Sequence, residues 1–403
     1  MTEARQALTG KMRLNARFRR VAAGILGFCA LPLGVLASAS NTVASETPTR
    51  MGSPVIADMK PKSGISVYWV GHSLVETKAQ SEWGEISLMS LVGRFAQARG
   101  LGYRMGDHTL WGSPMSALWR GKPHGYTRDA SAMVPKREQF EATAGQYDTL
   151  VLTEALPVHA ALKGEYSSYY LRRFYCALKS ANPSSRVYLY QTWVNLQGAD
   201  PYSKFPPAHR FDWRAEMVAQ RKDWEELAAQ GARAQVLEPG WFARIGWATK
   251  SNGGCDIEDP IYIIPAGQAM VALWDRLKAP QSTDDFAMPD GSRLTLADLF
   301  ANPYENWPND WPLSAEAEDI DPAAIVARFK PRDASRGHDD IHLSALGIYF
   351  VALVHFATLY GQSPVGLPVP SMVGEAVART LQCLVWQVVS SDPQSGVTAQ
   401  ETC

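Results

Sequence analysis

The chain has 403 residues, of which 46% are hydrophobic and 20% charged, so it can bury a large core and is not disordered throughout. This length suits one large α/β domain with insertions, or two smaller domains. The formal net charge is −1. A protein that binds nucleic acid usually carries a basic excess, so the sequence predicts no nucleic-acid partner.

The first residues read as an export signal. A basic stretch at 13–20 precedes an apolar run at 21–37, and small residues follow at 37–39. This order is typical of a cleaved secretory signal, here predicted as 1–39, with a polar linker at 40–62. A retained membrane anchor is the alternative, although glycines and a proline weaken the run as a spanning helix. We therefore expect a periplasmic or secreted protein with no stable membrane insertion after cleavage.

Four of the five cysteines lie beyond the predicted signal. They are Cys176, Cys255, Cys383 and Cys403. In an oxidising compartment they allow two disulfides, with three possible connectivities. Buried or free thiols are the other interpretation.

Predicted strands and helices alternate along the rest of the chain. Apolar runs predict strands at 64–70, 147–153, 186–193 and 234–238, and helical spacing predicts helices at 84–99, 166–181, 213–230, 266–278, 343–360 and 372–390. Such alternation favours a three-layer α/β/α fold with a mostly parallel sheet, whose ligand site lies at the carboxyl ends of the strands. We expect one domain at 63–362 with an insertion at 281–335. A C-terminal part at 363–403 would then hold the last helix and a loose tail from 391.

Two segments at opposite ends of this domain could carry chemistry. Ser73 follows the first predicted strand directly, at its carboxyl end. A serine hydroxyl needs a base to become a nucleophile. His342, just before a predicted helix, could be that base, and Asp339 could hold the far nitrogen of its ring. The fold would have to bring residues 73 and 342 together.

Both segments resemble blocks of the SGNH/GDSL hydrolases. The segment 71–74 (GHSL) resembles the first block of that family, with His72 where the family motif has Asp. The Asp339-x-x-His342 spacing resembles the last block. The resemblance spans about 64–360, and it implies a flavodoxin-like fold and ester hydrolysis by a serine mechanism.

The resemblance also implies roles for single residues. Ser73 would be the nucleophile, His342 the base and Asp339 the residue that orients it. Gly112 is the best candidate for the glycine of the second block, whose amide helps to bind the oxyanion.

The third block departs from the family pattern. It should contain an Asn that donates to the oxyanion, but residues 152–155 read LTEA. The amides of Ser73 and Gly112 could serve, with Thr153 or Asn195 as a third donor.

Several neighbouring residues have alternative interpretations. The HDDIH segment at 338–342 could instead bind a metal ion, although adjacent residues of one loop rarely converge on one point. Asp340 could replace Asp339, but the spacing favours Asp339 and leaves Asp340 to cap the next helix or to lie on the surface. Trp111 and Trp193 could line a sugar site or belong to the core. Glu154 is expected to orient a loop or a substrate.

These observations favour an exported serine esterase that needs no cofactor or metal. Its substrate would be an acylated small molecule or polysaccharide, with acetylated carbohydrate preferred. The alternatives are a periplasmic O-acetyltransferase that acts on an exported polysaccharide and a non-catalytic glycan-binding protein on the same fold.

Overall fold

The computed structural model describes most of the chain beyond the linker. The described residues are 62–122, 130–196, 212–239, 249–279, 285–303, 332–333, 335, 337–398 and 403. The predicted signal at 1–39, the linker up to 61 and most of the insertion at 281–335 lie outside them.

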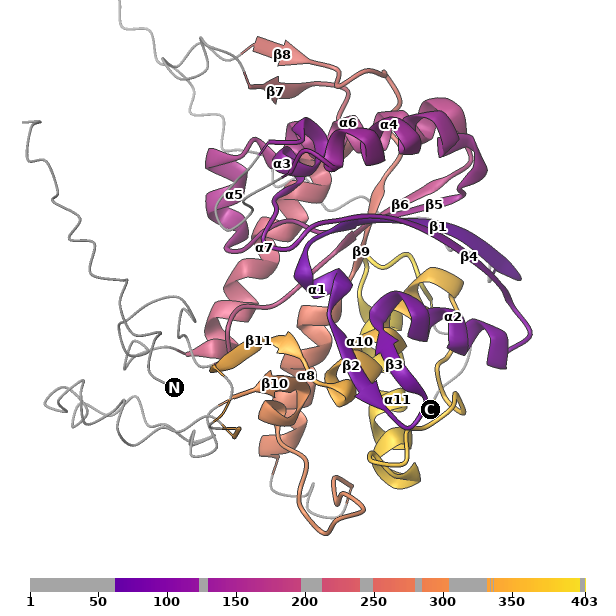
Figure 1. Ribbon diagram of the computed structural model, residues 1–403, viewed down its shortest axis with the longest axis vertical. Coiled ribbons are helices and arrows are strands. Elements are labelled where there is room, and N and C mark those ends of the chain that lie inside the picture. The colour runs from indigo at the N-terminus through magenta and orange to yellow at the C-terminus, as the bar shows by residue number, and fades with distance from the viewer. Residues whose placement is uncertain are drawn as a thin grey trace, which may run out of the picture. The chain divides into compact units, whose positions relative to one another are not determined.

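A five-stranded parallel sheet forms the centre of the described part (Figure 1). Its strands, in spatial order, are β4 (Gly102–Thr109), β1 (Gly64–Gly71), β5 (Thr149–Leu152), β6 (Arg186–Tyr190) and β9 (Ile261–Ile264). All four neighbouring pairs are parallel. Counted along the chain, this order is 2-1-3-4-5, which is the flavodoxin-like arrangement.

Both faces of the sheet are buried, and each strand contributes side chains to both, because successive residues point to opposite faces. In β1, Val67 and Trp69 join one hydrophobic cluster, whereas Tyr68 and Val70 join the other. Residues that must be apolar on both faces give continuous apolar runs instead of alternating ones. This is why the central strands could be recognised in the sequence.

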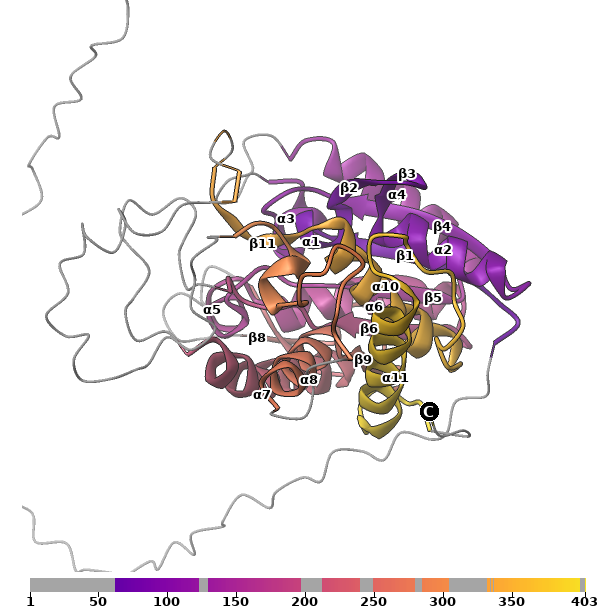
Figure 2. The same cartoon turned by 90° about the horizontal axis from the view of Figure 1, so that it is seen from below.

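Helices cover the two faces of the sheet and complete three layers (Figures 1 and 2). One layer holds α2 (Leu88–Ala98), α8 (Ala266–Lys278) and α10 (Ala345–Tyr360), with α11 (Glu375–Ser391) packed on α8 and α10. The other holds α3 (Met115–Arg120), α4 (Met133–Thr143), α5 (Val158–Gly164) and α6 (Ser167–Ala181). Helix α7 (Trp213–Ala232) packs against β9 and contributes to both clusters. The predicted three-layer α/β/α fold is confirmed.

Smaller elements decorate the ends of this core. Helix α1 (Ser73–Glu76) follows β1 and leads into a hairpin of β2 (Lys78–Ser81) and β3 (Gly84–Ser87). Two further antiparallel pairs are β7 (Val236–Glu238) with β8 (Thr249–Ser251), and β10 (Phe300–Asn302) with β11 (Asp339–Leu343). Short 3₁₀ helices occupy Ala144–Gln146 and Leu296–Leu299.

Four elements differ from the predictions. The helix predicted at 84–99 begins at Leu88, because Ser87 caps it by accepting a hydrogen bond from the amide of Ser90 at 3.2 Å. The strand at 234–238 exists, but only Val236 in it is buried and it pairs outside the main sheet. Strands β4 and β9 were not predicted, because β4 is a largely exposed edge strand and β9 is only four residues long.

The prediction of a loose tail from 391 is wrong for the described residues up to 398. The carbonyl of Gln394 accepts a hydrogen bond from the amide of Ile263 at 2.8 Å, and Val397 is buried. The tail therefore covers the open edge of β9, which would otherwise present unpaired backbone groups.

The four cysteines form the two disulfides that their number allows. Cys176 of α6 pairs with Cys255, and Cys383 of α11 pairs with Cys403 at the end of the chain. Across the described ranges, no helix combines the length and apolar character needed to cross a membrane.

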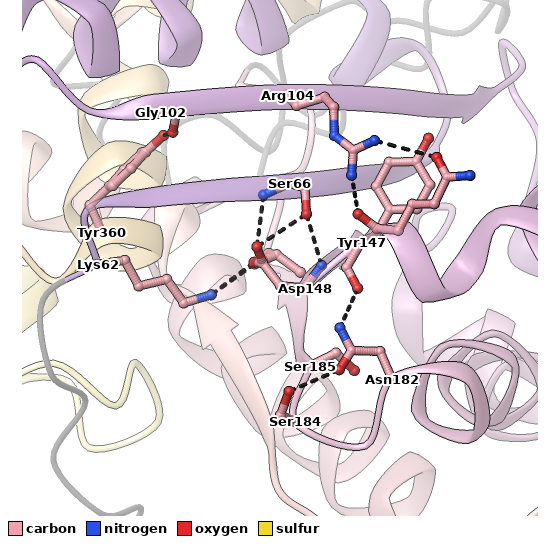
Figure 3. Close-up of polar contacts among 12 residues, drawn as sticks. Lys62, Ser66, Gly102, Arg104, Tyr147, Asp148, Asn182, Ser184, Ser185 and Tyr360 are labelled. Atoms are coloured by element: carbon pink, nitrogen blue, oxygen red, sulfur yellow. Dashed lines mark hydrogen bonds and ion pairs between the residues drawn. The ribbon is translucent and has the colours of Figure 1, made fainter.

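A cluster of polar residues lies at the amino end of the sheet (Figure 3). Lys62 donates to the carboxylate of Asp148 at 3.1 Å and to the hydroxyl of Thr149 at 3.0 Å. The other oxygen of Asp148 accepts from the amide of Ser66 at 3.0 Å and from its hydroxyl at 3.1 Å. These bonds hold the starts of β1 and β5 together.

Candidate active site

Ser73 lies where β1 ends and α1 begins, at the carboxyl end of the sheet. His72 is the N-cap of α1 and Ser73 its first residue, so the Ser73 amide is one of those that a helix leaves without an internal partner. A Cβ on Gly71 would come within 2.7 Å of Val75 and 2.8 Å of Thr153. The tight turn that presents Ser73 therefore requires glycine at 71.

Three side chains form a connected chain of hydrogen bonds at this point. Nε2 of His342 lies 2.8 Å from Oγ of Ser73, and Nδ1 of the same ring lies 3.0 and 3.1 Å from the two oxygens of Asp339. The fold thus brings together residues that are 269 positions apart. This is the geometry that a serine nucleophile, its base and an orienting carboxylate require.

The environment of Asp339 keeps its carboxyl group charged. Burial alone would raise its pKa, but the hydrogen bond from the His342 ring, the charge of that ring and bonds from two backbone amides outweigh burial. The pKa of Asp339 is therefore below its ordinary value. A carboxylate that stays ionised can fix the tautomer of His342 and stabilise the ring when it takes up a proton.

Strand β11 carries both His342 and Asp339, and the core holds it in place. It pairs with β10, and Nε1 of Trp193 donates to the carbonyl of Ile341 at 2.9 Å. Trp193 is completely buried in the hydrophobic core. Its predicted role in a sugar site is therefore wrong, and the alternative that it belongs to the core is right: Trp193 supports β11 from within the core.

Asp340 and Asn195 bind each other. Nδ2 of Asn195 donates to Oδ1 of Asp340 at 2.8 Å, and Asp340 is fully buried. The expected capping or surface role of Asp340 is wrong, because Ser344 caps α10 by accepting from the amide of Gly347 at 3.1 Å. Asn195, expected as an oxyanion donor, instead binds the start of strand β11 through Asp340.

Thr153, the other side chain proposed as a donor to the oxyanion, also bonds to other groups. The hydroxyl of Thr153 donates to the carbonyl of Tyr190 at 2.9 Å, and its amide donates to the carbonyl of Val70 at 3.0 Å. Thr153 therefore belongs to the sheet, and its prediction as a donor is wrong. The amides of Ser73 and of Gly112, whose φ is +66°, remain as the candidates.

Trp111 forms one wall of the site. Its ring stacks on the ring of His342 with 5.1 Å between centroids and 26° between planes. With 54% of its surface exposed, it is among the most exposed large apolar side chains of the described residues. A flat, accessible ring beside the base suits contact with a substrate.

Glu154 lies behind the site, away from any substrate. It is fully buried, and its Oε1 accepts from the amide of Ala155 at 2.7 Å and from that of Met115 at 3.2 Å. Burial raises the pKa of Glu154 to about 7. The interpretation of Glu154 as a substrate contact is wrong, whereas its alternative role in orienting a loop agrees with these contacts.

The role of His72 was not predicted from the sequence. Its Nδ1 accepts from the amide of Leu74 at 3.4 Å, so Nε2, which lies 3.0 Å from the carbonyl of Glu154, carries the proton. Burial lowers the pKa of His72 to about 4, which keeps the ring neutral at neutral pH. One signal in the sequence could have revealed this role. The family motif has Asp at this position, which is an ordinary N-cap residue, and His72 is another side chain that can accept a hydrogen bond.

A cavity of about 420 Å³ lies near the end of β11. It is placed between the β2–β3 hairpin and the β10–β11 pair. Lys78, Gln80 and Glu85 line one side, and Ala301, Leu343 and Ser344 line the other. The lining on the β11 side begins at Leu343, one residue beyond His342 in the chain.

The alternative of a metal site in the HDDIH segment has no geometric support. Asp339 and His342 bind each other, and Asp340 binds Asn195. Within the described ranges, no three His, Cys, Asp or Glu side chains are grouped so that they could hold a metal ion.

Solved structures that resemble this chain include two proteins of low sequence identity. One is a DUF4886 family protein from Bacteroides uniformis, with 12% identity over 81% of this chain and 95% of that one and a TM-score of 0.40. The other is a variant of an acetyl-xylooligosaccharide esterase from Geobacillus, with 15% identity over 43% of this chain and 75% of that one and a TM-score of 0.24. No family model and no curated protein sequence matches the chain. Likeness at this level leaves the activity to be argued from the geometry of the site.

Proposed function

We propose that this protein is a serine hydrolase of the SGNH type that cleaves ester-linked acyl groups. The observation that carries the proposal is the Ser73–His342–Asp339 chain of hydrogen bonds at the carboxyl end of a flavodoxin-like sheet. The family resemblance of the 71–74 and 339–342 segments supports the same assignment.

The reaction begins with a nucleophilic attack. Nε2 of His342 takes the proton of the Ser73 hydroxyl while Oγ attacks the ester carbonyl. The amides of Ser73 and Gly112 bind the oxyanion that develops, and Asp339 stabilises the charged imidazole. His342 then gives the proton to the leaving alcohol, and an acyl group remains on Ser73.

Water completes the turnover. His342 accepts a proton from a water molecule that attacks the acyl-enzyme, and the carboxylic acid leaves as Ser73 regains its proton. If a sugar hydroxyl took the place of water, the same steps would transfer the acyl group. The protein would then be an O-acetyltransferase, so the acceptor alone distinguishes the two activities.

The substrate side of the site favours an acetylated carbohydrate. The exposed ring of Trp111, which stacks on the ring of His342, offers a flat apolar surface to a sugar face. A small acyl group would occupy the space at Ser73 while the sugar contacts Trp111.

We propose that the protein works outside the cytoplasm. The basic, apolar and small-residue pattern of 1–39 is that of a signal peptide, and two disulfides suit an oxidising compartment. Expression with residues 1–39 and mass spectrometry of the exported protein test this. A mature chain that still contains residues 1–39 would refute cleavage.

A fluorophosphonate probe tests the central claim, because it reacts only with an activated serine. The wild-type protein should be labelled at Ser73, and it should release acetate from a short-chain aryl ester. The Ser73→Ala variant, which removes a single oxygen, is the matched control and should do neither. A wild-type protein that is folded but resists the probe would support the non-catalytic binding protein instead.

A further inference from the structure

Glu154 has two sets of contacts that lead to different parts of the site. It directly follows β5, at the carboxyl end of the strand next to β1. Its side chain bonds to the start of α3, and its backbone carbonyl bonds to the histidine that caps α1. No step of the proposed reaction uses Glu154, and full burial keeps it away from substrate.

The side chain fixes the loop that contains Gly112. Met115 is the first residue of α3, and its amide donates to Oε1 of Glu154 at 3.2 Å. The N-cap of α3 is Pro114, which has no polar side-chain atom with which to cap the helix. The carboxylate of Glu154 therefore takes the part that a local Ser or Asp usually plays, and it does so from another strand.

The backbone of Glu154 fixes the turn that contains Ser73. Its carbonyl accepts the Nε2 proton of His72 at 3.0 Å, and Nδ1 of that ring accepts the amide of Leu74. Ser73 lies between these two residues. Helix α1 has only four residues, so it has little stability of its own and depends on such contacts.

We propose that Glu154 is a positioning residue that ties the nucleophile turn to the oxyanion loop. Through its carbonyl it holds Ser73, and through its carboxyl it holds the loop with Gly112, so that both amides point at one oxyanion. This inference rests on the proposed esterase function. It gives a physical role to a residue of the 152–155 segment, which lacks the Asn of the family's third block.

The geometry of oxyanion binding requires a contact that holds the two loops at a fixed separation. Oxyanion donors must lie within about 2.7–3.1 Å of the place that the oxygen will occupy. A displacement of about 1 Å can cost about 10²-fold in rate. The two amides here belong to loops after different strands, β1 and β4, so a contact that spans both is needed to hold their separation.

The contacts also indicate which hydrogen-bonding group a residue that replaces Glu154 must have. Oε1 acts only as an acceptor for two amides, which the oxygen of a neutral side chain can also do. With its pKa raised to about 7 by burial, the carboxyl of Glu154 is itself partly neutral at neutral pH. Glutamine should therefore replace it, whereas leucine should not.

The first experiment compares Glu154→Gln with Glu154→Leu in the full-length protein. For an aryl acetate, Glu154→Gln should keep kcat within about threefold, and Glu154→Leu should lose about 10²-fold in kcat with KM unchanged. Hydrogen exchange in 110–118 and 72–77 should become faster in Glu154→Leu only. The Asp148→Ala variant, at the other end of the sheet, is the control for a loss of stability that leaves kcat unchanged.

A second pair of variants tests the hydrogen bond between the amide of residue 115 and Glu154 without changing Glu154. Met115→Pro deletes the amide proton that Glu154 accepts, at a helix position where proline is tolerated. Met115→Ala loses the same buried side chain but keeps that proton. We expect kcat of Met115→Pro to be at least about tenfold below that of Met115→Ala, with similar KM values. This pair remains informative if Glu154→Leu does not fold.

Three results would overturn the inference. They are a normal kcat in folded Glu154→Leu, a Glu154→Gln variant as impaired as Glu154→Leu, or equal kcat values for the two Met115 variants. A wild-type protein without ester hydrolysis would instead refute the proposed function. Hydrogen exchange in 110–118 would then still decide whether Glu154 holds the loop.

Discussion

The two ends of the central sheet both carry an aspartate that accepts several hydrogen bonds, but the two clusters differ in what they can do. At the amino end, Asp148 accepts from Lys62, Ser66 and Thr149, and each partner is a permanent donor (Figure 3). At the carboxyl end, Asp339 accepts from His342, whose other nitrogen faces a hydroxyl. The first cluster joins an ammonium group, hydroxyls and an amide to its carboxylate, whereas the second places an imidazole ring between its carboxylate and a serine hydroxyl.

Trp111 distinguishes the carboxyl end further, because its exposed ring stacks on the ring of His342. At the amino end, Figure 3 shows bonds among side chains and backbone groups of neighbouring segments. Similar residue types therefore stabilise the sheet at one end and are placed for reaction at the other, and mutations should separate these two roles.

The largest expected effect is on Ser73 and His342. Either Ser73→Ala or His342→Ala should lower kcat for an aryl acetate by about 10⁶-fold, because the triad acts as a unit. The double variant should be hardly worse than either single one. Thermal melting should change little, since neither side chain belongs to the hydrophobic core. Substantial hydrolysis by Ser73→Ala would show that the nucleophile is another residue.

Asp339→Asn should have the next largest effect on rate. Asparagine cannot hold the His342 tautomer or stabilise its charge, so a loss of about 10⁴-fold is expected with the fold intact. Asp340→Asn is the matched control. It should keep its rate within about tenfold but lose about 1–3 kcal/mol of stability, because its buried bond to Asn195 is disturbed. An inactive Asp340→Asn beside an active Asp339→Asn would reverse the assignment.

Acid should destabilise the carboxyl end first. Burial lowers the pKa values of His72, His108 and His338 to about 4 each, below their unfolded value of about 6.5. The unfolded chain thus binds more protons between these values, so stability should fall as pH drops from about 6.5 to 4. Burial also raises the pKa values of Glu154 and Asp392, which act in the opposite direction, but it lowers the pKa of a fourth histidine, His355, to about 3, and this adds to the loss in acid.

Thermal melting and hydrogen exchange at pH 7.5 and 5 measure this loss. Faster exchange should begin in 72–77 and 337–343 before it reaches 62–66. Equal acceleration at both ends of the sheet would contradict a difference in acid sensitivity between them.

The smallest expected effect belongs to the amino end. Asp148→Ala removes an acceptor of bonds from Lys62, Ser66 and Thr149, but 40% of its side chain is exposed and the ion pair is screened. We expect a loss of about 1–2 kcal/mol in the free energy of unfolding, measured by urea denaturation, and an unchanged kcat. A fall in kcat at 25 °C would mean that the two ends are coupled.

The sequence alone determined the features that depend on neighbouring residues and on periodicity. The continuous apolar run at 64–70 predicted the central strand β1, and amphipathic spacing predicted most of the helices. Motif spacing was enough to select Ser73, Asp339 and His342 as a set. These signals are local, because strand burial, helix faces and a D-x-x-H turn each depend on a few consecutive residues.

Only the tertiary structure decided what the remaining polar groups do. Trp193, Thr153 and Asn195 were compatible with the site by type and position, but their partners are Ile341, Tyr190 and Asp340, which lie on other elements. The edge strands β4 and β9 were not predicted, because a short or exposed strand has a weak hydrophobic pattern in the sequence. Glu154 shows the reason most directly: a buried acceptor takes its role from the donors that the fold brings to it, and those donors, at 72 and 115, are far from it in sequence.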